Sequence, residues 1–206
     1  MIDGEWMDEP CFIIGGGPSL IGFDFERLRG YGRIIAINRA YEFIPFADIH
    51  FFMDRSYYKR IQGEAAWQAF QGRKIYLNKS SPGILDKIIL LHPLGRTGLS
   101  KSIAAGIYHG NNSGAAAIGL AYALGANPIY LLGYDCKRIP EHSYFHSGYG
   151  KRISDFVLAR WVKYFNAMAP LLQANGTQVI NLNPDSAIRC FPFSTMDTIE
   201  DARGQA

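Results

Sequence analysis

Short apolar runs alternate with amphipathic or polar stretches along this chain, and the alternation predicts its fold. Buried β-strands are indicated where a run is rich in β-branched or aromatic residues and ends at a turn-forming residue, over residues 11–14, 33–38, 49–53, 74–77, 128–132 and 178–182. The stretches between them predict helices over residues 24–29, 56–71, 112–125 and 154–174. Strands that alternate with helices predict the α/β class, as a doubly wound, mostly parallel, Rossmann-like sheet with helices on both faces.

Length and composition favour a single domain. The chain has 206 residues, of which 48% are hydrophobic and 19% charged. This is enough for one buried core and short for two, so we expect one nucleotide-binding domain over residues 1–206 with its core at about 11–192. The formal net charge of +3 favours an anionic ligand but falls short of a dedicated nucleic-acid binder.

The cysteines and the apolar runs limit the cellular setting. Cys11, Cys136 and Cys190 are far apart and follow neither disulfide nor zinc-ligand spacing, so we expect no metal site and a reducing compartment. The first ten residues lack the apolar core of a signal peptide, and no apolar run approaches the length of a membrane span. The sequence therefore predicts a cytoplasmic protein without a membrane span.

The first predicted strand runs directly into a glycine-rich loop made of Gly15, Gly16, Gly17, Pro18 and Ser19. Glycine lets a ligand approach the main chain, and a phosphate there would meet N–H groups and the positive end of a following helix. The loop lacks the lysine of a Walker motif, the third glycine of the dinucleotide fingerprint and the spacing of a nucleophile elbow. A glycine-rich turn that binds no ligand is the alternative.

Three polar residues, Asn38, Asp54 and Asp135, stand at or just after the ends of predicted strands. Open α/β sheets bind ligands at the carboxyl ends of their strands, where the strand order reverses. We expect the order to reverse around the strands that end at residues 14, 37 and 132, and the ligand to lie across them. For Asn38, a turn-forming role is the alternative.

The predicted helix over residues 112–125 begins with Asn112, Ser113 and Gly114, and its first turn is built of small residues. Asn112 or Ser113 is a ready N-cap, and small side chains leave the helix N-terminus open to an anion. Close packing of the helix on the sheet is the alternative explanation for its alanines. Residues 78–110 form a connection that is long for a compact domain, which favours a functional role.

The five histidines differ in their expected surroundings. His50 lies within a strand, His92 adjoins a proline, and His109 is close enough to the helix at residue 112 to contact a donor phosphate. His146, with His142 in reserve, lies in a polar loop that also holds Tyr144 and Tyr149. Histidine is the side chain whose pKa suits a general base near neutral pH, so His146 is the candidate base, and Asp54 is the next candidate. The alternative is that both loop histidines are solvated and have no catalytic role.

Several of these motifs occur in the same order as in two related groups of proteins. They are Ile-Ile-Gly-Gly-Gly-Pro-Ser-Leu, the strand end Ala-Ile-Asn38, the helix entry Asn112-Ser113-Gly114, and Ile-Tyr-Leu-Leu-Gly-Tyr-Asp135 before a loop with histidines. Over about residues 11–192 the chain resembles the bacterial lipo-oligosaccharide sialyltransferases, which use a CMP-activated sugar. It also resembles the archaeal 6-hydroxymethylpterin diphosphokinase-like family (the domain of unknown function 115 type), which has many bacterial and phage relatives.

The resemblance implies a nucleotide-dependent transferase of bacterial or phage type, in which a loop histidine is the base. It implies that the nucleotide is surrounded by Gly15, Gly17, Ser19, Asn38, Ser113 and Gly114. The chain has Asn-Asn-Ser-Gly where the sialyltransferases have Pro-Thr-Ser-Gly, and we expect no counterpart of their membrane-associating tail. The resemblance therefore does not fix sialic acid as the donor sugar.

Three functions follow from these patterns. The leading hypothesis is a glycosyltransferase that moves a sugar from a nucleoside-phosphate donor to the hydroxyl of a glycan, a small molecule or a modified nucleic acid, with no required cofactor. The second is a diphosphokinase that uses ATP and Mg²⁺, with Asp54 and Asp135 as metal ligands. The third is a non-catalytic nucleotide-binding module. A homo-oligomer is compatible with all three.

Overall fold

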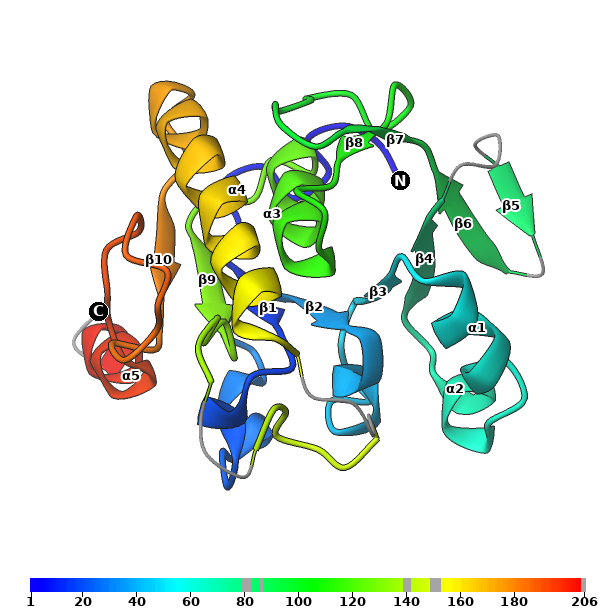
Figure 1. Ribbon diagram of the computed structural model, residues 1–206, viewed down its shortest axis with the longest axis horizontal. Helices are drawn as coiled ribbons and strands as arrows, with labels where there is room; N and C mark the ends of the chain where they lie inside the picture. Colours follow the sequence, from blue (N-terminus) through cyan, green and yellow to red (C-terminus); the bar gives the residue numbers. More distant parts are fainter. Residues whose placement is uncertain (79–82, 86, 139–141, 149–152, 205–206) are drawn as a thin grey trace.

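An eight-stranded sheet forms the centre of the computed structural model, which describes residues 1–78, 83–85, 87–138, 142–148 and 153–204 (Figure 1). Its strand order is β10-β9-β1-β2-β3-β4-β6-β5. The strands are β1 (Cys11–Ile14), β2 (Arg33–Ile37), β3 (Ile49–Phe52), β4 (Arg73–Leu77), β5 (Gly83–Leu85), β6 (Ile88–Leu91), β9 (Ile129–Leu132) and β10 (Val179–Asn181). All neighbouring strands are parallel except β5 and β6, which confirms the mostly parallel sheet.

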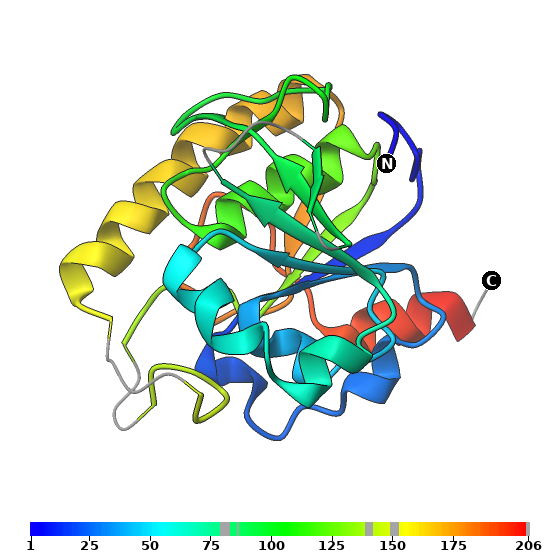
Figure 2. The same ribbon diagram turned by 90° about the vertical axis from the view of Figure 1, so that its right-hand side faces the viewer.

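Helices cover both faces of the sheet, as predicted (Figure 2). Helices α3 (Ser113–Ala123) and α4 (Asp155–Ala174) lie on one face. The other face carries α1 (Arg55–Ile61), α2 (Ala65–Ala69), α5 (Met196–Gly204) and the 3₁₀ turns η1 (Pro18–Leu20), η2 (Phe25–Leu28) and η3 (Asn38–Glu42). Successive side chains of a strand point to opposite faces, so Ile13 packs into the core under α3 whereas Phe12 and Ile14 pack into the core on the other side. No helix in the described ranges is long and apolar enough to cross a membrane.

The strand order reverses at β1, as the sequence predicts. β2, β3 and β4 extend the sheet on one side of β1, and β9 and β10 extend it on the other. Ile14, the last residue of β1, pairs in register with Ala36 of β2 and Leu132 of β9. The carboxyl ends of these strands therefore diverge around a single crevice, which is where open α/β sheets place a ligand.

The predicted helix after the glycine loop is absent from the described structure. The chain between β1 and β2 forms only η1 and η2, because the backbone is already extended at Ile21 and Gly22 then takes φ +76°. Residues 24–29 are likewise a 3₁₀ turn capped by Asp24 rather than an α-helix. The helix dipole expected at the glycine loop is thus a wrong prediction. Within the loop, the N–H groups of Gly15 and Gly17 donate to the carbonyls of Leu132 and Gly133.

Two further predictions need correction. The single helix expected over 56–71 is two short helices, because the chain turns at Gly63 and restarts with Glu64 in an extended conformation. The turn lets Tyr57 and Trp67 both reach the core. The connection over 78–110 contains β5 and β6 of the main sheet, and β7 (Pro93–Gly95) pairs with β8 (Ile107–Tyr108) in a second, two-stranded sheet.

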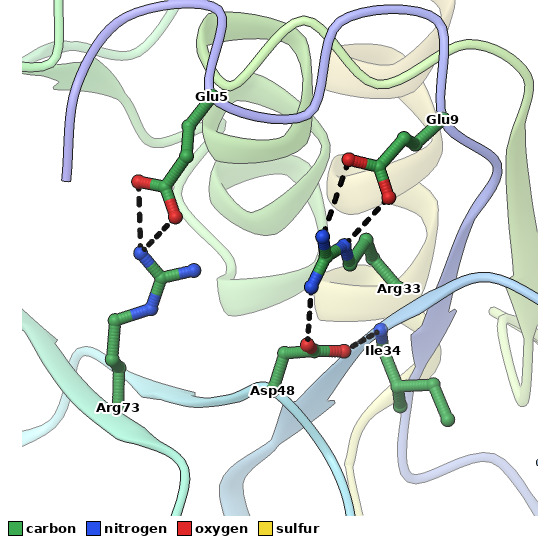
Figure 3. Close-up of polar contacts among 6 residues, drawn as sticks. All are labelled: Glu5, Glu9, Arg33, Ile34, Asp48 and Arg73. Carbon is green, nitrogen blue, oxygen red and sulfur yellow. Dashed lines mark hydrogen bonds and ion pairs between the residues drawn. The ribbon is translucent and has the colours of Figure 1, made fainter.

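The N-terminal segment is held across the amino ends of the strands, at the edge opposite the crevice (Figure 3). The Arg33 guanidinium donates to both oxygens of Glu9, at 2.8 and 3.2 Å, and to Asp48 at 3.2 Å. Arg73, the first residue of β4, pairs with Glu5 at 2.7 Å. Between these pairs Trp6 is fully buried. These contacts stabilise the scaffold and leave the carboxyl edge of the sheet open.

Candidate functional site

A cavity of about 550 Å³ opens at the carboxyl ends of the central strands. This volume lies within the usual range for small-molecule sites. Its polar wall comprises the glycine loop (15–18), the entry to α3 (111–114), residues 133–137 after β9, and the loop residues Tyr144 and His146. Its apolar wall comes from the first turns of α4. In Figure 1 the N-termini of α3 and α4 converge with the glycine loop at the lower edge of the sheet.

Most of the residues predicted for the site line this one cavity: Gly15, Gly16, Gly17, Pro18, Asn38, Asp54, Asn112, Ser113, Gly114, Asp135 and His146. Two predicted residues do not. Ser19 lines a second, smaller cavity of about 210 Å³ on the other side of the loop, and His142 is exposed on the surface. Tyr149, expected beside the histidines, lies outside the described residues.

Asp135 holds the glycine loop in place. Its carboxylate accepts hydrogen bonds from the Ser19 hydroxyl (2.8 Å), the Ser19 N–H (3.2 Å) and the Asn183 amide (3.2 Å). Asp135 is only 3% exposed, and burial raises the pKa of its carboxyl despite the Ser19 donors. A Cβ on Gly17 would collide with this carboxylate, which explains the glycine there. Asp135 therefore belongs to the cavity wall and holds the glycine loop in place, whereas Ser19 binds Asp135 from outside the main cavity and supports the loop.

Backbone strain is concentrated around the cavity. Asn38, Asn111 and Cys136 have φ values of +52°, +54° and +46°, in the left-handed region that residues other than glycine rarely adopt, and all three line the cavity. Such strain is typical of functional sites. The side-chain oxygen of Asn38 is also buried with no hydrogen-bond partner among the described residues, so it suits a ligand that brings an N–H or O–H donor.

The N-terminus of α3 presents two N–H groups to the cavity. The Asn112 side chain caps the helix by accepting from the N–H of Ala115 at 2.7 Å, which confirms Asn112 as the N-cap. Within the described structure, the N–H groups of Ser113 and Gly114 donate to no acceptor. This is expected, because the first N–H groups of a helix have no carbonyl partner within the helix. Both residues line the cavity. The helix dipole adds to these donors, so this end of the cavity attracts an anion.

The loop that carries His146 is anchored next to the glycine loop. The N–H of Phe145 donates to the carbonyl of Gly16 at 3.1 Å. The Phe145 ring packs against Phe25 and Phe43, at centroid distances of 5.6 and 4.9 Å. These contacts place the neighbouring His146 on the cavity wall, where its ring stacks on Tyr144 at 5.6 Å.

His146 is a neutral imidazole at physiological pH. Burial lowers its pKa to about 4, and the nearby Arg39 charge acts in the same direction. Its Nδ1 accepts a hydrogen bond from the N–H of Gly148 at 3.2 Å. A neutral imidazole that accepts at Nδ1 carries its proton on Nε2. In this arrangement His146 is therefore a hydrogen-bond donor at Nε2.

The two remaining candidates behave differently. Asp54 caps no helix N–H, is exposed, and lines the cavity at the start of α1. His50 is fully buried and its Nε2 lies 3.2 Å from the Tyr57 hydroxyl. Burial lowers the pKa of His50 to about 3. His50 is thus a packed residue within the aromatic core, as its place in a strand indicates.

Sequence reasoning missed part of the cavity wall. The cavity is also lined by three residues of α4, Val157, Trp161 and Phe165. Their helical spacing in the sequence is that of residues that pack into a hydrophobic core. A cavity wall and a core need the same apolar residues, so periodicity cannot separate them. Lys137 is the one lysine or arginine among the described lining residues, and within that same part of the chain no cluster of three or more histidine, cysteine or acidic side chains forms a metal site.

No protein-family model and no curated protein matches the sequence. Among solved structures, the chain is similar to the sialyltransferase CstII from Campylobacter jejuni in complex with a substrate analogue, cytidine-5′-monophosphate, with a TM-score of 0.56 and 14% identity over 92% of this chain and 86% of that one. It is also similar to the sialyltransferase CST-II in complex with a trisaccharide acceptor and CMP, with a TM-score of 0.52 and 14% identity over 89% and 84% of the two chains. At this identity the likeness shows that the chain shares their fold.

Proposed function

We propose that this protein is a glycosyltransferase that binds a nucleoside-monophosphate sugar in the main cavity and transfers the sugar to an acceptor hydroxyl. The observation that carries the proposal is the convergence of the glycine loop, the open N-terminus of α3 and the loop of His146 on one cavity. Solved proteins of the same fold bind CMP, which supports a nucleotide in this crevice.

The charges on the wall favour a donor with a single phosphate. The N–H groups of Ser113 and Gly114 and the helix dipole suit one phosphate group, and Lys137 lies on the same wall. A triphosphate would bring several more negative charges. Asp135, the carboxylate that a magnesium-dependent reaction would need, instead accepts hydrogen bonds from Ser19 and Asn183. These contacts support sugar transfer rather than diphosphate transfer from ATP.

His146 is the proposed general base. The acceptor oxygen attacks the anomeric carbon, the bond from that carbon to the phosphate oxygen breaks, and the nucleoside monophosphate leaves with the electron pair. The acceptor proton passes to His146, whose lowered pKa keeps it unprotonated at neutral pH. To accept at Nε2, the ring must carry its own proton on Nδ1, which requires release of the Gly148 N–H contact. Asp54, on the same wall, is the second candidate.

The apolar wall is the proposed place of the sugar and acceptor. Val157 and Trp161 offer aliphatic and aromatic surface in the same cavity as the N–H groups of Ser113 and Gly114. Ligand sites commonly combine such an apolar wall with a few orienting polar groups. This arrangement would hold the transferred sugar between α4 and the loop of His146.

Nucleotide binding tests the proposal. Thermal unfolding is followed with CMP, UMP, GMP, AMP and ATP, each with and without Mg²⁺. A nucleoside monophosphate at about 100 times its Kd adds roughly 2.7 kcal/mol to the free energy of unfolding, which raises the Tm of a domain this size by about 5–10 °C. Asn38→Leu, which removes the unpaired oxygen at the wall, should reduce this shift, whereas Asn78→Leu, outside the cavity, should not. No shift with any monophosphate would contradict the proposal.

A further inference from the structure

We propose that His109 is a second catalytic histidine of the cavity, one that donates a hydrogen bond from Nε2 to the phosphate oxygen leaving the sugar. This inference rests on the proposed function, and it names the residue that contacts the leaving phosphate. Three observations carry it: the place of His109 on the cavity wall, the fixed position of its backbone, and the tautomer set by its Nδ1 contact.

The backbone of His109 is fixed against the phosphate end of the cavity. His109 directly follows β8 and lines the cavity. Its N–H donates to the carbonyl of Gly95 at 2.8 Å, and its carbonyl accepts from the N–H of Asn112 at 3.0 Å. Asn112 is the N-cap of α3, so one hydrogen bond joins His109 to the helix end that offers the N–H groups of Ser113 and Gly114. A phosphate at these groups would therefore lie beside His109.

The Nδ1 atom of His109 accepts a hydrogen bond from the N–H of Asn111 at 3.1 Å. Since Nδ1 accepts, the neutral ring carries its proton on Nε2 and is a donor there. Asn111 has φ +54°, a strained conformation for a residue other than glycine, and the turn that it forms brings its N–H to the imidazole. The hydrogen bond from the Asn111 N–H thus favours the tautomer in which Nε2 of His109 can donate to a phosphate oxygen.

A donor at this position is chemically useful because negative charge develops on the phosphate as the sugar leaves. When the bond from the anomeric carbon to oxygen breaks, its electron pair stays on the phosphate oxygen, and the Nε2–H of His109 stabilises the new charge. No proton needs to transfer, because the acceptor proton passes to His146. Removal of one such preorganised donor typically lowers turnover by about 10²–10³-fold.

Paired variants test this role. His109→Leu removes the donor, and His109→Gln replaces it with an amide N–H. His92→Leu is the control, because His92 is an exposed histidine beside β7 and lies outside the cavity lining. Calorimetry measures the Kd of CMP and of cytidine, and CMP release from a CMP-linked sugar gives kcat.

His109→Leu should weaken CMP binding by about 10-fold or more, the usual effect of losing a hydrogen bond to a charged group, and leave cytidine binding within about 2-fold of wild type. Turnover should fall by about 10²-fold, His109→Gln should recover most of both losses, and His92→Leu should change neither. CMP affinity and turnover near wild type in His109→Leu would overturn the inference while leaving the proposed function intact. A wild-type protein that binds no nucleoside monophosphate would overturn both.

A measurement on the wild-type protein covers the case in which His109→Leu fails to fold. Nitrogen-15 NMR of the imidazole rings reports which ring nitrogen carries the proton. The His109 signals should show the Nε2–H tautomer, and that proton should shift on addition of CMP but not of cytidine. A proton on Nδ1, or an Nε2 signal that CMP leaves unchanged, would overturn the inference.

Discussion

Ser19 donates two hydrogen bonds to Asp135, one from its hydroxyl at 2.8 Å and one from its backbone N–H at 3.2 Å. These bonds connect the loop after β1 to the end of β9, across the point where the strand order reverses. The glycine loop is therefore held by a side chain of the neighbouring strand end and not by a helix of its own. The shape of the polar wall depends on this contact.

The first prediction concerns Asp135. Asp135→Ala leaves the buried partner Asn183 and the donors of Ser19 without an acceptor, which should lower the free energy of unfolding by about 2–3 kcal/mol. The freed glycine loop should also weaken nucleotide binding. Urea unfolding and CMP calorimetry measure the two effects, with Asp185→Ala as the control, because Asp185 is exposed. Stability and affinity equal to the control would show that the loop does not depend on Asp135.

The second prediction concerns acid stability. The pKa of His50 is lowered by burial to about 3, from about 6.5 in an unfolded chain, so below pH 6.5 the unfolded state binds more protons. Stability should therefore fall as the pH falls, by about 2 kcal/mol between pH 7 and pH 5 from this residue. His50→Gln should flatten that part of the urea-midpoint profile, and His92→Gln should not. His146, whose pKa is also lowered, acts in the same direction. A pH profile of the urea midpoint that is the same in His50→Gln as in wild type would show that His50 does not cause the loss of stability in acid.

The third prediction concerns the loop anchor. Phe145→Ala removes the ring that packs on Phe25 and Phe43, so the adjacent His146 should lose its fixed position. Turnover should fall by about 10-fold or more while the Kd of CMP stays near wild type, because a misplaced catalytic group affects the chemical step. Phe46→Ala is the matched control, since Phe46 is half-buried against the same hydrophobic core but stacks on Arg29. Equal turnover in both variants would show that the anchor has no catalytic role.

The fold could be predicted from the sequence because each central strand is a short apolar run with a clear end. The N-cap role of Asn112 could be predicted because asparagine is a preferred N-cap residue and Asn112 stands directly before a helix that begins with small residues. The 3₁₀ turns after the glycine loop could not, since a few glycines decide between a turn and a helix and their φ values are invisible in the sequence.

The site was predicted less completely because side-chain direction depends on tertiary contacts. Ser19 follows the glycine loop in the sequence, yet it turns away from the cavity to bind Asp135. His142 and His146 are histidines of the same polar loop, and the contacts of Phe145 with Gly16 and Phe43, which the sequence does not show, place His146 on the cavity wall. Trp161 lines the cavity, but in the sequence its position in the helix is indistinguishable from that of a core residue.

The fourth prediction concerns metal dependence. Asp135 is buried and saturated with hydrogen-bond donors, and Asp54 is exposed on the cavity wall, so this pair is poorly suited to hold Mg²⁺. Sugar transfer should therefore continue in EDTA at a rate within about 2-fold of that with Mg²⁺. The assay measures nucleotide release in both conditions. Complete loss in EDTA with recovery on adding Mg²⁺ would favour diphosphate transfer from ATP.

The most direct test of the account is the rate of CMP release from a CMP-linked sugar in the presence of a hydroxyl acceptor, compared between wild type and His146→Ala. We predict that the wild-type protein releases CMP, and that the variant does so about 10²-fold more slowly with a nearly unchanged Kd for CMP. His142→Ala, the exposed histidine of the same loop, should match wild type. No release by the wild-type protein with CMP-, UDP- or GDP-linked sugars would contradict the transferase, and wild-type rates in His146→Ala would move the base to another residue, with Asp54 the next to test.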